Sequence, residues 1–336
     1  MSKQAFKTQT EHTYRPYPET QIIRENYDLK VSTPWLTLEL ELEPENLNWS
    51  DSKILEELSD YPFAYAVNSS SPSCRKALTP DSPALSSHLK DFKHYLGDTE
   101  FEFDHLLSDS IIDHERIDPI TLYTYLRRKR YQNAIDFCQS FSLFDMLDKQ
   151  STLEFIHKVR MVLRQNHYVT QKCFESLQPA LEISKVTYEV MKKFIKEEQG
   201  HDYILEEALN SIPNTNIKDI EVFQATKDLM KLLKTVAGHQ ELFPAFCCLL
   251  ESFEGSSFDE TDPLADYLSK NKLTKKAAQQ LQKHHEINLH GHHFSIGHSL
   301  LSKFDYISFD QAYQCVYVFN IAKTLNQKIV KGIIHA

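Results

Sequence analysis

The sequence predicts an all-α protein, in which a bundle of seven or eight helices follows an irregular N-terminal extension. Three observations predict this fold class. The chain has 336 residues but only seven glycines, so few positions are suited to the left-handed conformations of tight turns. From about residue 115 onward, apolar residues recur at helical spacing. The connecting segments, such as SIPNTNI and EGSSFDETDP, are short and carry turn residues, as connections in helical bundles do.

Residues 1–110 differ from the rest of the chain and form a predicted extension of unknown role. Prolines would interrupt any long helix there, at Pro16, Pro18, Pro34, Pro44 and Pro62. The run WLTLELELE, from Trp35 to Glu43, alternates apolar and acidic residues as strands do, although leucine and glutamate also form helices well. Segment 68–87 is rich in serine and proline, which is typical of a loop or linker. We expect an arm that packs on the main domain or is partly disordered.

The helical domain is predicted to extend from residue 115 to residue 336. Its first helix begins with Asp118 in the capping position and Pro119 at the first helical position. The second has Ser151 and Glu154 at the spacing of a capping box. Further helical patterns cover approximately 183–211, 217–236, 239–254, 260–270, 274–292 and 307–331.

Composition and charge argue against several classes of function. A net charge of −10 argues against a nucleic-acid partner, because affinity for phosphates comes mostly from basic residues. The chain has no run of 18 apolar residues, so we expect no membrane span. Six scattered cysteines without a Cys-x-x-Cys pair indicate reduced thiols. The N-terminus lacks the apolar stretch of a signal peptide, so a cytoplasmic protein is expected.

Polar residues interrupt the helical pattern at three places, and the first is FIKEEQGHDYILEEAL. Glu197 and Glu198 precede His201 by four and three residues, so either glutamate would share a helix face with the histidine. Di-iron bundles take two ligands from such a Glu-x-x-His pair. The alternative is an exposed charged face, since further lysines and glutamates lie nearby.

The second place is FPAFCCLLESFEGSSF, where an apolar run meets Glu251 and then Glu254. A buried carboxylate is costly unless it is paired or bound to a metal. These glutamates therefore lie either at a metal site or at the solvated end of the helix.

The third place is HHEINLHGHHFSIGH, residues 284–298, which holds six of the sixteen histidines. On an α-helix His285 and His292 would project in nearly the same direction, and His284 would be adjacent to Asn288. Neutral imidazole is a common ligand for iron or zinc. The alternative is a solvated histidine-rich face, against which the intervening apolar residues argue. The remaining histidines are expected to take no part: His290, His293 and His298.

Together these motifs resemble the heme-oxygenase-like iron-containing oxidases, a helical family related in fold to thiaminase-like and pyrroloquinoline-quinone-synthase-like proteins. The resemblance rests on EEQGHD, on the later glutamate of an apolar helix, and on the late His-x-x-x-Asn-x-x-x-His run. It covers residues 115–336 and not the N-terminal third. It implies a heme-oxygenase-like bundle that holds two irons.

The family's ligands are Glu, His, Glu, and then His, Asp and His from one late helix. The resemblance therefore implies these metal ligands here: Glu197 or Glu198, His201, Glu251 or Glu254, His284 or His285, Asn288, and His292. The chain departs from the family where aspartate is usual, because Asn288 or Leu289 stands there. That departure puts the second iron in doubt and leaves a one-iron or metal-free scaffold as alternatives.

The resemblance implies a non-heme iron oxidase that uses O2 on a small organic substrate. Its pocket would be lined by aromatic residues such as Tyr168, Tyr188, Phe194, Tyr203 and Phe246. One alternative is a non-catalytic interaction protein on the same scaffold. Another is a metal-free thiaminase-like enzyme with Cys247 or Cys248 as nucleophile. Structural zinc fits less well, because no cysteine adjoins the histidines. An exposed apolar helix face would support a homodimer.

Overall fold

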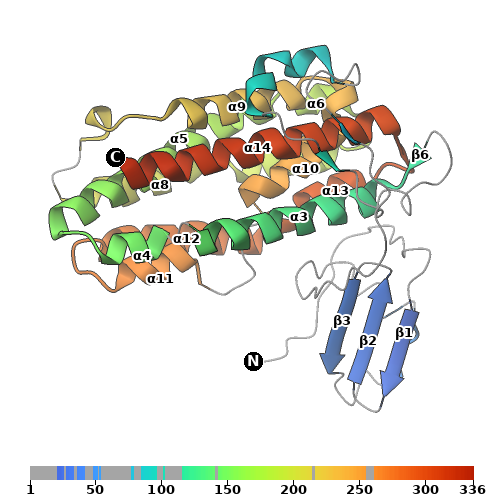
Figure 1. The fold of residues 1–336 in the computed structure, drawn as a ribbon, viewed down its shortest axis with the longest axis horizontal. Coiled ribbons are helices and arrows are strands. Elements are labelled where there is room, and N and C mark those ends of the chain that lie inside the picture. The colour runs from blue at the N-terminus through green and yellow to red at the C-terminus, as the bar shows by residue number, and fades with distance from the viewer. Residues whose placement is uncertain are drawn as a thin grey trace.

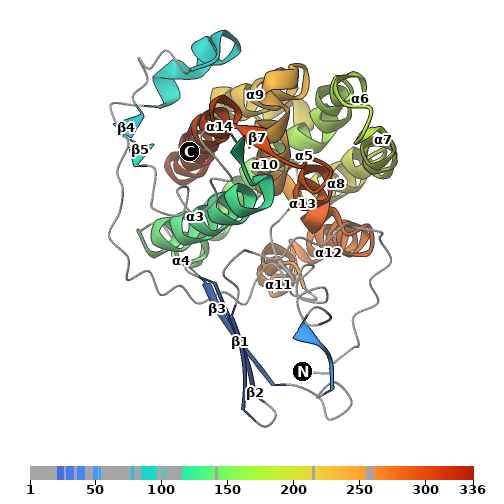
Figure 2. The same cartoon turned by 90° about the vertical axis from the view of Figure 1, so that its right-hand side faces the viewer.

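The computed structural model describes residues 21–25, 28–33, 36–41, 48–51, 53, 77–78, 85–96, 101–102, 116–140, 143–213, 216–254 and 261–336. Most of these residues are helical, so the predicted all-α class is confirmed. The long helices run side by side in Figure 1, and Figure 2 shows several of them nearly end-on. None of the helices in this part of the chain has both the length and the apolar character needed to cross a membrane.

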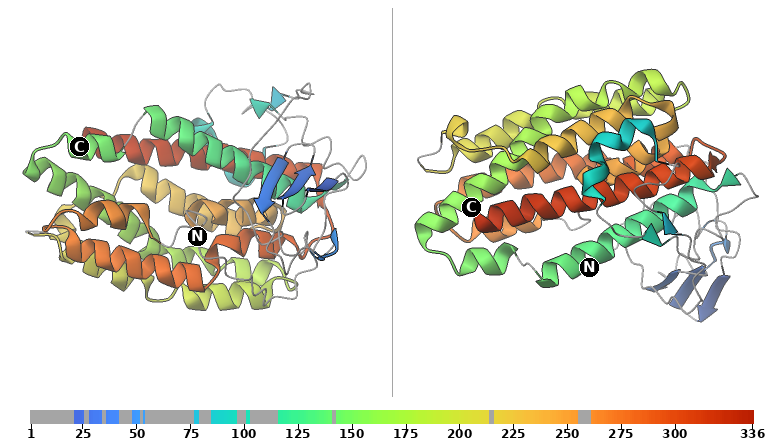
Figure 3. Two further views of the ribbon diagram at one scale, coloured as in Figure 1. Left: turned by 90° about the horizontal axis from the view of Figure 1, so that it is seen from below. Right: turned by 45° about the horizontal axis from the view of Figure 1, so that its top comes forward.

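The helices follow one another through the C-terminal two thirds of the chain. In order they are α3 (Pro119–Ser140), α4 (Leu143–Asp148), α5 (Thr152–Leu177), α6 (Ala180–Ile183), α7 (Tyr188–Glu197), α8 (His201–Asn210), α9 (Gln224–Ala237), α10 (Phe243–Glu254), α11 (Pro263–Ser269), α12 (Lys275–His290), α13 (Ile296–Leu301) and α14 (Phe309–His335). Short 3-10 helices are η2 (Ser87–Tyr95), η3 (Ile217–Asp219), η4 (Gln240–Leu242) and η5 (His293–Ser295). In Figure 3 the last helix, α14, extends along most of the bundle.

The strands are short and lie mostly near the N-terminus. Strands β1 (Gln21–Glu25), β2 (Asp28–Thr33) and β3 (Leu36–Glu41) form an antiparallel sheet in the order β1-β2-β3. Two small ladders pair β4 (Ala77–Leu78) with β5 (Phe101–Glu102) and β6 (Arg116–Ile117) with β7 (Ile307–Ser308). The alternation of WLTLELELE thus corresponds to β3, whereas most of the predicted linker 68–87 lies outside the described residues.

The predicted helix starts agree with the structure. The Asp118 carboxylate accepts hydrogen bonds from Ile120 N at 2.8 Å and Thr121 N at 3.4 Å at the start of α3. Ser151 and Glu154 form the reciprocal capping box of α5. These caps satisfy amide groups that have no partner inside the helix.

Two of the predicted helical patterns run past a break in the helix. The pattern over 183–211 runs through the break between α7 and α8, where Gly200 has φ +92°. Glycine tolerates this left-handed conformation, which ends a helix. The pattern over 274–292 also runs too far, because α12 ends at His290 and His292 has φ +54°.

The buried side chains form two main hydrophobic clusters. The larger one joins α3, α7, α9, α10, α13 and α14, with Phe246 and Tyr317 fully buried. The second joins α5, α8, α11 and α12, with Leu209 and Leu268 fully buried. The α7–α8 turn and the C-terminal end of α10 lie close together, so elements of both clusters meet there.

The segment η2 packs against α9 and α14. Its apolar side chains Leu89, Phe92 and Tyr95 are buried, and the Tyr95 hydroxyl donates a hydrogen bond to Asp228. Lys231 of α9 pairs with Asp91 at 2.8 Å. Apolar burial and polar contacts together fix this segment on the bundle.

Candidate metal centre

The turn between α7 and α8 brings the first two polar residues of the centre together. Glu198 is the C-cap of α7, and His201 is the first residue of α8 after Gly200. His201 Nδ1 lies 3.4 Å from Glu198 Oε1, and both side chains are almost fully buried. The pairing predicted three residues apart is therefore present, although a turn, and not a continuous helix, positions it.

A second turn, after α12, brings His293 into the centre. Gly291 ends the helix, His292 takes the left-handed conformation, and His293 begins η5 with 1% of its surface exposed. A Cβ added at Gly291 would lie 2.6 Å from Cδ2 and Nε2 of the His293 ring. The chain thus needs glycine at this position to leave room for the imidazole.

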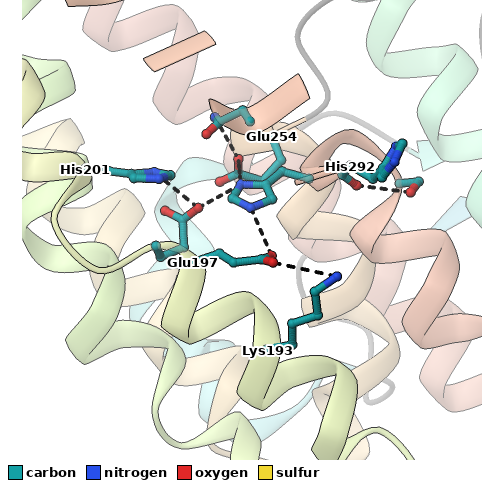
Figure 4. A network of polar contacts seen from close by, with 9 residues as sticks. Lys193, Glu197, His201, Glu254 and His292 are labelled. Carbon is teal, nitrogen blue, oxygen red and sulfur yellow. Dashed lines mark hydrogen bonds and ion pairs between the residues drawn. The ribbon is translucent and has the colours of Figure 1, made fainter. Parts of the chain in front are cut away.

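His293 is the centre of the cluster. Its Nδ1 lies 2.9 Å from Glu198 Oε1 and 3.6 Å from Glu254 Oε2. Its Nε2 lies 3.4 Å from Glu197 Oε2, and Glu197 is a third exposed and also pairs with Lys193 at 3.6 Å. Figure 4 shows Glu197, His201 and Glu254 gathered in one place, with Lys193 at the edge of the group.

Helices α10 and α12 place further polar side chains around His293. Glu254 is the last residue of α10, and Asn288 Nδ2 donates a hydrogen bond to its Oε2 at 3.3 Å. The ring of His284, one turn before Asn288, packs edge-on against His201 with centroids 5.0 Å apart. Of the two helical registers considered for this segment, the face with His284 and Asn288 is therefore the one directed at the cluster.

Six buried polar atoms of this group have no hydrogen-bond partner among the described residues: Glu198 Oε1, both ring nitrogens of His201, both of His293, and Asn288 Oδ1. The 2.9 Å contact between His293 and Glu198 is a charge contact without hydrogen-bond geometry. A buried polar atom without a partner costs about 1–3 kcal/mol. A cation between Glu198, Glu254 and His293 would satisfy Glu198 Oε1 and one ring nitrogen of His293.

The protonation equilibria of the cluster are strongly linked. Burial raises the pKa of Glu254, and the neighbouring Glu198 carboxylate raises it further. Burial alone would raise the pKa of Glu198, but His201 and His293 outweigh this effect and lower it. Burial disfavours protonation of His293, yet the two carboxylates raise its pKa to about 10. The carboxylates therefore strongly favour a positive charge at their centre.

His284 differs from His293 in its electrostatic environment. Burial, together with the charge of His201, lowers the pKa of His284 to about 4. Its imidazole is thus neutral at ordinary pH, which is the form that binds metals.

The donor atoms have spacings that suit one metal ion. Ligand atoms of Glu198, Glu254 and His293 all lie within 4.8 Å of one another. Two donors bound to one ion at about 2.1 Å lie roughly 2.9–4.2 Å apart, depending on their angle. The contacts of His293 with the two glutamates, at 2.9 and 3.6 Å, fall in that range. The residues present therefore fit a metal bound by mixed carboxylate and imidazole ligands.

The structure brings together some of the expected ligands and not others. Glu197, Glu198, His201, Glu254, His284 and Asn288 lie in or beside the cluster. His285 is buried on α12, about 100° around the helix from His284. The side chain of Glu251 lies outside the described residues.

His292 and His293 reverse the roles expected from the sequence. His292 is exposed and lies to one side of the cluster in Figure 4, so the prediction that it completes the late-helix ligands is wrong in this structure. His293, expected to take no part, makes the closest contacts with the carboxylates. The reason is the turn at Gly291, which breaks the helical extrapolation from His284 to position 292.

Cys173 is a neighbour of the centre that the sequence pattern did not indicate. It lies on α5, and burial raises the pKa of its thiol, as do the carboxylates of Glu198 and Glu254. No spacing rule could have found this residue, because it is far from Glu198 and Glu254 in the sequence and its place depends on tertiary packing.

The residues expected to line a pocket have mixed environments. Phe194 is buried and packs edge-on against His293 with centroids 5.0 Å apart, and Phe246 is fully buried. Tyr188 and Tyr203 are exposed by 38% and 68%, so the prediction that they line the interior is wrong. Tyr168 is partly buried against the larger core cluster.

A pocket of about 490 Å³ lies elsewhere, at the surface formed by α5, α8 and η3. It is lined by Arg164, His167, Gln171, Glu206, Asn210, Asn216, Ile217 and Lys218. None of the residues of the candidate metal centre contributes to its lining.

Of the two cysteines named as possible nucleophiles, Cys247 is disfavoured by its position. This side chain is fully buried, and burial raises the pKa of its thiol well above the ordinary value. A nucleophilic cysteine requires the thiolate, which a raised pKa disfavours.

No family model matches the chain, and searches of curated proteins and of solved structures found no similar protein.

Proposed function

We propose that the protein is a non-heme iron oxidase of the heme-oxygenase-like type, which acts with O2 on a small organic substrate. The observation that carries this proposal is the convergence of Glu198, Glu254 and His293, with His201 beside them, at a buried point. Glutamate and histidine ligands with open coordination positions suit Fe(II) and dioxygen chemistry. Iron bound there would supply the redox step on O2.

The proposed iron ligands are Glu198, Glu254 and His293, with His201 as a fourth. Asn288 stays neutral and holds the Glu254 carboxylate through its hydrogen bond of 3.3 Å. In this role it orients a ligand, as groups behind metal ligands commonly do. Because Asn288 brings no negative charge, we propose one firmly held iron, with the second iron of the family absent or weakly bound.

The surroundings of the cluster favour oxidation chemistry on a substrate protected from water. Phe194 covers one side of His293, and the side chains of Glu198 and His201 are at most 4% exposed. Glu197, at 32% exposed, is the cluster residue most open to solvent among those that contact His293. We propose that the substrate approaches from the Glu197 and Lys193 side, where the ammonium of Lys193 could attract an acidic group.

Iron loading under anaerobic conditions tests the proposal. Protein reconstituted with Fe(II) and desalted should retain at least one iron per chain, and exposure to O2 should produce a transient absorption band. His293→Ala should retain little iron, because it removes the donor closest to both carboxylates. His292→Ala is the matched control: it changes the adjacent, exposed histidine and should retain iron as the unmodified chain does.

Two results would overturn the proposal. One is iron at background level in the unmodified chain, which would favour a non-catalytic interaction protein on the same scaffold. The other is equal iron retention by the His293→Ala variant, confirmed as folded by circular dichroism. That result would place any iron at different residues.

A further inference from the structure

A second group of metal-binding side chains lies at the surface, where η2 meets the connection between α9 and α10. It consists of His88 on η2, His239 just before η4, and Glu241 in η4. One donor atom from each residue lies within 4.8 Å of the other two. None of these residues belongs to the buried cluster, so this observation is independent of the proposed iron centre.

The imidazole rings of His88 and His239 lie face to face. They stack with centroids 3.5 Å apart and planes inclined by 18°. Two nitrogens bound to one tetrahedral zinc ion at 2.0–2.1 Å lie roughly 3.3 Å apart. His88 Nε2 is also 3.1 Å from Glu241 Oε1, a separation that two donors sharing one ion would have. Because an imidazole nitrogen binds a metal in the plane of its ring, the two stacked rings would tilt apart when all three side chains bind one ion.

The chemistry of these donors selects the kind of metal. Imidazole nitrogens favour borderline divalent ions such as zinc, copper and nickel over magnesium and calcium. Two histidines and one glutamate, with the fourth position open, are also the ligand set of several zinc enzymes. The side chains of His88 and Glu241 are 39% and 51% exposed, so water can occupy the open position and the ion can exchange.

We propose that His88, His239 and Glu241 form an exchangeable surface site for a divalent ion of the zinc class. The ion joins η2, which comes from the N-terminal part of the chain, to the α9–α10 connection of the bundle. It therefore adds a metal-dependent link to the apolar and ionic contacts that already hold η2 against α9.

Zinc titration of the full chain tests this site. Zn²⁺ is added in competition with a chromophoric chelator, and the number of bound ions per chain is compared between variants. His88→Ala and Glu241→Gln should each bind one ion fewer than the unmodified chain, or bind it at least 10- to 100-fold more weakly. Loss of an outer partner of a metal ligand already costs that much, so loss of a direct ligand costs no less.

His94→Ala is the matched control, because His94 is an exposed histidine of the same segment whose ring packs at a tilt against Tyr95 and is not part of the group. It should bind Zn²⁺ as the unmodified chain does. Circular dichroism checks that each variant is folded, and exposed positions such as these should tolerate substitution.

Two results would overturn the surface site: equal zinc binding by His88→Ala and the unmodified chain, or equal losses in His88→Ala and His94→Ala. Iron retention distinguishes this failure from failure of the buried centre. His88→Ala should keep the iron that His293→Ala loses, and His293→Ala should keep the surface zinc.

Discussion

Replacement of Gly291 by alanine tests how the turn after α12 positions His293 in the proposed metal centre. The added Cβ would lie 2.6 Å from two atoms of the His293 ring. An ordinary contact between such atoms is about 3.5 Å, so the ring has to move by approximately 0.9 Å. Metal sites tolerate deviations of only about 0.2 Å in ligand distance.

The displacement should therefore weaken Fe(II) binding, even though every proposed ligand is still present in the chain. We expect a loss of at least 10- to 100-fold in affinity, as for disturbed partners of metal ligands. The assay is anaerobic competition for Fe(II) between the protein and a chromophoric chelator, with thermal unfolding measured on the same samples.

Gly238→Ala provides the matched control. Gly238 follows α9 as Gly291 follows α12, but a Cβ there would meet its nearest neighbour at 3.4 Å, an ordinary contact. This variant should bind Fe(II) normally. Normal binding by Gly291→Ala as well would refute the reasoning, because it would mean that the position of the His293 ring does not determine metal affinity.

Three further predictions concern the bundle and its packing. Gly297→Ala should lower the free energy of unfolding by about 1–3 kcal/mol in urea titrations, because a Cβ would collide with the Cys247 carbonyl group; an unchanged midpoint would contradict this close crossing of α13 and α10. Lys158→Met should lower the free energy of unfolding by roughly 2 kcal/mol, because the buried ammonium donates hydrogen bonds to two carbonyl oxygens at the end of α14. Stability equal to that of the unmodified chain would show that these bonds contribute little. Burial and the Asp228 carboxylate raise the pKa of Tyr95 from 10.0 to about 12. The stability linked to this shift is present below pH 10 and is lost as the pH rises toward 12, so Tyr95→Phe should lose less stability over that interval. Parallel profiles of stability against pH for the two chains would contradict the linkage.

The sequence predicted the helical class and the local signals at helix starts. The caps at Asp118 and Ser151 depend on residues within one turn of the chain, and such interactions can be recognised from spacing alone. The break at Gly200 was missed because apolar periodicity continues through it, although a glycine there is compatible with a helix end.

The spacing of the sequence identified residues of the candidate centre where they lie close together along the chain. Glu198 and His201 meet across three residues, so the spacing rule found them. His293 was missed because its position depends on the conformation of Gly291 and His292, and a left-handed histidine cannot be inferred from helical periodicity. The pairing of Asn288 with Glu254 joins residues 34 positions apart, and it depends on how α10 packs near α12.

The side chains of the proposed centre come from helices of both hydrophobic clusters. Glu198 and Glu254 belong to helices of the larger cluster, whereas His201 and Asn288 belong to helices of the second. An ion held by both groups would be released when either half of the bundle opens. Its binding energy would then oppose both opening reactions, by about 2.7 kcal/mol when free metal is at 100 times Kd. Metal occupancy would thus make two separately packed halves unfold as one cooperative unit.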